Sequence, residues 1–185
     1  MSKKVMAVAL LGIASVAGYA QAFELSSPDV PKKGMMPQDS LFNGFGCTGP
    51  NISPALHWKN APAGTKSFAV IMHDPDAPTG VGGFRHWVVV DLPADLSGIP
   101  KGASKLNSDT LLGGRQIATD IGATGYVGPC PPTGTASKPH SYQFTVYALK
   151  VEKLDLPANA SAAVAGFMAN MNKLGTATMI GSYGR

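Results

Sequence analysis

The sequence has few charges and few cysteines, and after its first residues it has no long apolar run. Charged residues make up 14% of the chain, and basic residues do not cluster with aromatics, which argues against binding to nucleic acid. The motifs G-x-S-x-G, G-x-G-x-x-G, H-E-x-x-H and the P-loop are absent. Glycine and proline are abundant, at 22 and 15 residues, and they exclude a long helical bundle. We therefore expect a loop-rich, mainly β globular domain.

The N-terminus has the pattern of a signal peptide. Two lysines lie among the first four residues, Val5–Ala17 is an uninterrupted run of apolar and small residues, and Ala20-Gln21-Ala22 matches a cleavage site. The run is too short to span a bilayer, which takes about 20 residues. We expect residues 1–22 to be removed, leaving one domain at 23–185 that is periplasmic or secreted. A buried N-terminal helix is the alternative.

Export changes the interpretation of the two cysteines. Cys47 and Cys130 are 83 residues apart, and an even number of cysteines in an oxidising compartment favours one disulfide. Two buried free thiols are the alternative. Because the pair lacks C-x-x-C spacing, it predicts neither a zinc site nor a redox motif.

Short apolar runs predict the strands and one helix. The runs 67–73, 87–92 and 142–149 are rich in β-branched and aromatic residues and read as buried strands, with a weaker candidate at 176–180. A helix capped by Asn159 or Ser161 is expected to stop at Gly175. Its large apolar residues follow helical spacing and are expected to pack in the core: Val164, Phe167, Met168, Met171 and Leu174.

Two loop segments carry the candidate site residues. The first, His73-Asp74-Pro75-Asp76-Ala77-Pro78, follows a strand, and its prolines stiffen a turn that presents two acids. His86 begins the next strand, so the two acids and this histidine are expected at one end of a sheet. The second runs from Gly125 to Pro132, whose glycines can expose backbone N–H groups to an anion. His140 and Tyr142 open the strand that follows it.

Each feature also has a simpler interpretation. Asp-Pro-Asp is most often only a turn, and a histidine at a strand end is most often structural. Asp74, Asp76 and His86 lack the spacing of a metal hydrolase. The residues alone therefore predict an exported β-rich domain with a polar pocket, and no metal or cofactor.

In this order, the segments resemble the phosphatidylethanolamine-binding protein (PEBP) family, in its bacterial Raf-kinase-inhibitor-like branch of the YbhB/YbcL type. The resemblance covers nearly all of 23–185, and the contexts of both cysteines are similar to those of exported bacterial members. The stretches that carry it are Asn51–Trp58, Asp74–Gly80, His86–Val90, and Gly125–Pro132 followed by His140-Ser141-Tyr142.

The resemblance implies a fold and a site. The fold would be a central antiparallel Greek-key sheet with a smaller second sheet and peripheral helices, including a C-terminal one. The site would be a small surface pocket for phosphate, phosphorylethanolamine or a similar anion. By position, its ligand-binding residues would be Asp74, Asp76, His86, Gly128, Pro131, Pro132, His140 and Tyr142.

This chain departs from the family pattern at two places. Ser141 stands where many members have arginine, and extra residues near Gln116 are expected to reshape the rim of the pocket.

The resemblance favours a non-enzymatic binding protein. The alternatives are a regulator of a protein partner, such as a protease or a host signalling protein, and a hydrolase using Asp74, Asp76 and His86. Bacterial relatives often resemble homodimers, so a homodimer is a further alternative for this chain.

Overall fold

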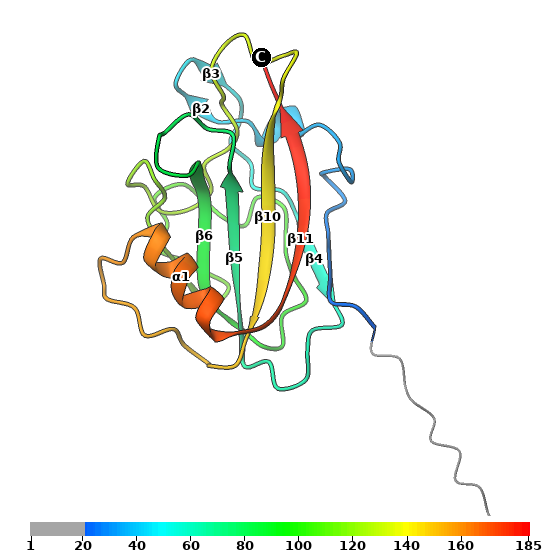
Figure 1. The fold of residues 1–185 in the computed structure, drawn as a ribbon, viewed down its shortest axis with the longest axis vertical. Coiled ribbons are helices and arrows are strands. Elements are labelled where there is room, and N and C mark those ends of the chain that lie inside the picture. Colours follow the sequence, from blue (N-terminus) through cyan, green and yellow to red (C-terminus); the bar gives the residue numbers. More distant parts are fainter. Residues whose placement is uncertain (1–20) are drawn as a thin grey trace, which may run out of the picture.

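A computed structural model describes residues 21–185 as two stacked antiparallel β-sheets with one α-helix on the outer face of the larger sheet (Figure 1). The predicted signal peptide, residues 1–22, falls almost wholly on residues 1–20, which lie outside the described part of the chain. No helix within 21–185 is long and apolar enough to cross a membrane.

The larger sheet has the order β11-β10-β5-β6-β9-β8, and all of its pairs are antiparallel. The four strands β10-β5-β6-β9 have the Greek-key order, in which the fourth strand returns to lie beside the first. The strand bounds are β5 Ser67–Asp74, β6 Phe84–Pro93, β8 Thr110–Leu111, β9 Gly114–Gln116, β10 His140–Leu149 and β11 Lys173–Tyr183. All four strands expected from the sequence are therefore present.

The smaller sheet has the order β1-β4-β7, and a short hairpin of β2 and β3 lies apart from it. A single 3-10 turn, η1 at Gln38–Ser40, precedes that hairpin. The bounds are β1 Glu24–Ser26, β2 Asn43–Gly44, β3 Cys47–Thr48, β4 Leu56–Lys59 and β7 Gly98–Ile99. This mainly β architecture with a C-terminal helix confirms the expected fold class.

Both faces of β5 are buried, which explains its continuous apolar sequence. Phe68, Val70 and Met72 join the core between the two sheets. Ala69 and Ile71 alternate with them and join the layer beneath the helix, because successive side chains of a strand point to opposite faces.

The helix α1, Ala162–Asn172, corrects the sequence-based interpretation of its apolar stripe. Its N-cap is Ser161, whose hydroxyl accepts from the N–H of Val164 (3.3 Å). The side chains that face the sheet are small: Ala162, Ala165 and Ala169. The stripe expected in the core is largely at the surface, with Phe167 62% exposed and Val164, Met171 and Leu174 also exposed.

The end of the helix was also predicted wrongly. The helix stops at Asn172, and Gly175 already belongs to β11, where it pairs with Ala148. The chain passes from helix to strand at Lys173 without an intervening turn.

Candidate functional site

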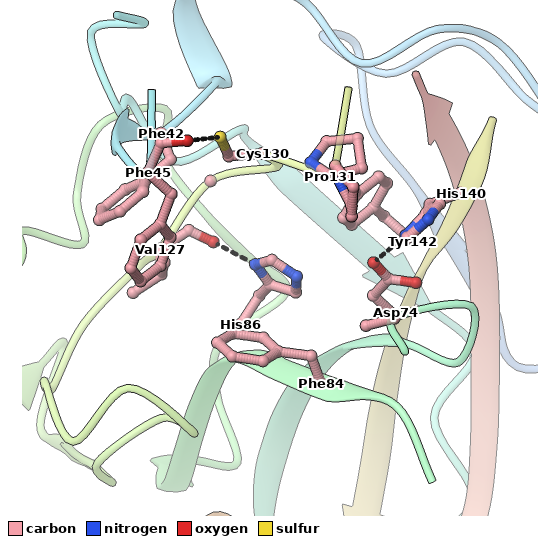
Figure 2. A pocket seen from close by; sticks show the side chains of 13 residues that line it. Phe42, Phe45, Asp74, Phe84, His86, Val127, Cys130, Pro131, His140 and Tyr142 are labelled. Carbon is pink, nitrogen blue, oxygen red and sulfur yellow. Dashed lines mark hydrogen bonds and ion pairs between the residues drawn. The ribbon is translucent and has the colours of Figure 1, made fainter. Parts of the chain in front are cut away.

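A small cavity at one end of the larger sheet brings most of the predicted site residues together (Figure 2). Its volume is about 90 Å³, room for a few water molecules or one small oxyanion. Seven of the eight predicted residues line it: Asp74, His86, Gly128, Pro131, Pro132, His140 and Tyr142. Asp76 lies outside this lining.

Both oxygens of Asp74 are engaged within the protein. Oδ1 accepts from the N–H of Asp76 (2.9 Å), which closes the turn after β5. Oδ2 accepts from Nδ1 of His140 (2.8 Å), which joins β5 to the start of β10. Because Asp74 is only 2% exposed, this carboxylate mainly holds the cavity's floor and orients His140.

Asp76 braces the same corner from outside. Its Oδ2 accepts from the N–H of Ser141 (2.7 Å). Ser141 follows His140 in β10, so this bond ties the Asp-Pro-Asp turn to the strand that carries two cavity residues. The two acids of the turn therefore hold the turn and β10 together.

His86 lies at the centre of the cavity and is 6% exposed. Its Nδ1 is 2.9 Å from the carbonyl oxygen of Val127. The ring packs 4.7 Å from that of Phe84 and 5.2 Å from that of Tyr142, centroid to centroid. Burial lowers the pKa of His86 from 6.5 to about 4, although carbonyl contacts from Val127 and Gly128 raise it in part.

The wall opposite His86 is the segment from Tyr126 to Pro132. Asn51 holds it from behind: its Nδ2 donates to the carbonyl of Tyr126 (2.9 Å), and its Oδ1 accepts from the N–H of Gly128 (2.8 Å). The Gly128 N–H is therefore occupied and does not face a ligand. A Cβ at Gly128 would collide with the carbonyl of Ser40, so only glycine fits there.

Tyr142 contributes a buried hydroxyl without a partner. The side chain is fully buried, and its hydroxyl has no hydrogen bond within the described residues. Burial raises the pKa of Tyr142, and Asp74 adds to the shift, so the phenol keeps its proton and can donate.

Aromatic side chains form the rim, and sequence reasoning missed them. Phe42, Phe45 and Phe84 line the cavity, and Phe45 is 68% exposed. Phe84 had a recognisable signal, because it precedes His86 by two positions and so shares its strand face. The two phenylalanines near Cys47 had none, since nothing local shows that their hairpin folds over β6.

The rim is closed by a disulfide and an arginine. The structure joins Cys47 to Cys130, and Cys130 itself lines the cavity. Arg185 donates to the carbonyls of Pro131 (2.7 Å), Gly46 (3.2 Å) and Phe45 (3.1 Å). The arginine thus ties together the same two loops as the disulfide.

Gln116 is deep in the protein, beside β6. Its Oε1 accepts from Nε1 of Trp87 (3.0 Å) and from the hydroxyl of Ser104 (2.6 Å). The Ser104 hydroxyl also accepts from the N–H of Tyr126 (3.0 Å). Gln116 is 3% exposed, so it supports the cavity wall from within.

Comparison with known proteins assigns the chain to a family. Residues 26–184 match the sequence model of the phosphatidylethanolamine-binding protein family. The UPF0098 protein YbcL of Escherichia coli (strain K12) is 41% identical over 182 residues, covering 98% of both chains. The UPF0098 protein YbhB of the same strain is 45% identical over 156 residues, covering 84% of this chain and 96% of its own.

The fold gives the same assignment. The crystal structure of E. coli YbcL, described as a new member of the mammalian PEBP family, superposes with a TM-score of 0.82 at 44% identity. The superposition covers 88% of this chain and 98% of YbcL. From sequence and fold together, this chain belongs to the phosphatidylethanolamine-binding protein family.

Proposed function

We propose that this chain is a non-enzymatic binding protein whose cavity takes phosphate or the phosphorylated head group of a small molecule. The observation that carries the proposal is the buried hydroxyl of Tyr142, which has no partner among the described residues and belongs to a side chain that lines the cavity. A buried polar group without a partner costs about 1–3 kcal/mol. A ligand oxygen that accepts from this hydroxyl removes the cost, and a charged oxygen makes the stronger bond.

The rim suits a ligand that also carries an ammonium group. Aromatic faces attract cations, and the rings of Phe42, Phe45 and Phe84 surround the cavity. In this proposal the rings, rather than the fully engaged Asp74, receive the cation. Phosphorylethanolamine has both groups, which agrees with the family's name.

The lining favours binding over catalysis. The sulfur of Cys130 is bonded to Cys47 and is no nucleophile. Asp74 is hydrogen-bonded through both oxygens. We also infer an extracytoplasmic location, supported by the disulfide, since such bonds persist in oxidising compartments.

Titration calorimetry with phosphorylethanolamine and inorganic phosphate tests the binding proposal. Tyr142→Phe removes the donor and keeps the ring, so it should weaken both ligands by about 10- to 150-fold, the equivalent of 1.5–3 kcal/mol. Tyr147→Phe is the matched control, because Tyr147 lies on the same strand but packs against the opposite face of the sheet.

Two results would contradict the proposal. Unchanged affinity in a folded Tyr142→Phe protein would show that the hydroxyl does not contribute to binding. If neither ligand binds the wild-type protein at millimolar concentration, the anion-binding proposal fails and a role through a protein partner takes its place.

A further inference from the structure

Two hydrogen bonds join His86 to Val127, and the one made by the ring sets its tautomer. The N–H of Val127 donates to the carbonyl of His86 (3.0 Å), and Nδ1 of His86 lies 2.9 Å from the carbonyl oxygen of Val127. A carbonyl oxygen only accepts hydrogen bonds, so Nδ1 carries the proton. The ring cannot turn over without breaking this bond to a wall that Asn51 holds in place.

The surroundings keep this ring neutral at pH 7. With a pKa lowered to about 4, mainly by burial and further by His73 and His140, about one molecule in a thousand is protonated there. Asp74, the carboxylate in the cavity lining, is hydrogen-bonded to His140.

The other titratable groups around the ring do not offset the effect of burial on its pKa. Tyr142 on β10 meets the ring edge-on and keeps its own proton. Arg85, next to His86 in β6, is paired with Asp120 (3.5 Å). No carboxylate in the described residues makes a hydrogen bond to His86.

A neutral ring with its proton on Nδ1 has a bare lone pair on Nε2. Figure 2 shows this second nitrogen on the side of the ring that faces the cavity, away from Val127. No described residue donates to it. A fully ionised oxyanion likewise has only lone pairs to offer. The two repel each other unless a proton lies between them.

We propose that the cavity selects phosphate monoesters or inorganic phosphate, bound with one proton shared between a ligand oxygen and Nε2 of His86. This inference rests on the proposed function, because it requires an oxyanion in the cavity. Below the second ionisation, near pH ~6, the ligand brings the proton itself. Above it, the dianion, neutral His86 and one proton from solvent combine to give the same complex. Phosphate diesters, including phospholipid head groups, and sulfate esters have no such proton to bring.

Calorimetry at pH 8, in buffers of different ionisation enthalpy, tests the proton count. Phosphorylethanolamine should bind with uptake of about one proton. Above pH 7 its affinity should therefore decrease about tenfold for each pH unit. At pH 5 the uptake should approach zero. Glycerophosphorylethanolamine, a diester with the same amine, and ethanolamine O-sulfate should each bind at least tenfold more weakly at pH 6.

Histidine variants show where the proton lies. His86→Gln places an amide in the cavity that donates at any pH, so proton uptake at pH 8 should disappear and the sulfate ester should approach the monoester in affinity. His57→Gln is the matched control, because His57 is exposed on β4, and it should keep the uptake. If His86→Gln does not fold, the ¹⁵N NMR signals of the wild-type His86 ring provide the test instead. Added phosphate should shift the Nε2 signal, because Nε2 becomes protonated or hydrogen-bonded.

The outcomes separate this inference from the proposed function. If no phosphate compound binds between pH 5 and pH 8, both fail. If phosphorylethanolamine binds at pH 8 without proton uptake, or the diester binds equally well, the proton-sharing inference fails while the anion-binding proposal stands. An unchanged Nε2 signal in a phosphate-saturated sample would likewise contradict the proton-sharing inference and leave the anion-binding proposal standing.

Discussion

Burial of the His86 imidazole makes the stability of the fold depend on pH. Folding lowers the pKa of this ring from 6.5 to about 4. Between those values the unfolded chain binds a proton that the folded chain does not. The stabilisation is therefore complete above pH 6.5 and is lost as the pH falls towards 4.

We expect His86 alone to lower the free energy of unfolding by about 3 kcal/mol between pH 7 and pH 4. Urea denaturation of the wild type and of His86→Asn across this range measures it. The asparagine amide can still donate to the Val127 carbonyl but does not titrate, so its stability should fall less steeply. Parallel curves for the two proteins would contradict the assignment.

At the scale of elements, α1 packs through its small residues. Ala165 and Ala169 are fully buried against the sheet, where Ile71 and Val88 already fill the space between helix and strands. The large residues at 164, 167 and 171 have the same helical spacing one face away. Periodicity alone cannot choose between two apolar stripes of one helix, and the larger residues are the wrong choice here.

Substitutions on the two faces of α1 should therefore differ. Phe167→Ala should change the free energy of unfolding by only about 0.5 kcal/mol, as at other surface positions. Ala165→Leu should cost about 1–3 kcal/mol, because it overpacks the layer beneath the helix. Thermal melting of both variants checks this. If Phe167→Ala loses more stability than Ala165→Leu, the ring of Phe167 packs in the core after all.

Strands β5 and β6 were the most predictable because both of their faces are largely buried. Continuous apolar runs such as 67–73 are then readily interpreted as buried strands. The motifs around Asp74 and His86 lie where those strands end. The parts that were not predicted depend on contacts between distant segments. Phe42 lines the cavity from a segment that is distant from β6 in the sequence, and Gln116 on β9 accepts from Trp87 on the neighbouring strand β6. No local pattern encodes such contacts.

For the whole molecule, the Cys47–Cys130 disulfide closes a loop of 83 residues. In the chain-entropy description a loop of that length contributes about 4–5 kcal/mol. Reduction, or the Cys47→Ser/Cys130→Ser variant, should lower the unfolding free energy by up to this amount in urea denaturation.

Material prepared from the periplasm should be lighter by two hydrogen atoms than after reduction. Two alkylatable thiols in that material would contradict the bond.

The Greek-key order of β10, β5, β6 and β9 also sets how the chain reaches its native state. The pairing of His73 with Gln143 joins residues 70 positions apart, and the hydroxyl of Tyr126 reaches the carbonyl of Ser40 over 86 positions (3.0 Å). Chains dominated by such distant pairings fold in milliseconds to seconds rather than microseconds. The cavity is built from these pairings, so its parts assemble only as the fold completes. We therefore expect a ligand that binds this cavity to slow unfolding of the whole domain and to leave its folding rate unchanged.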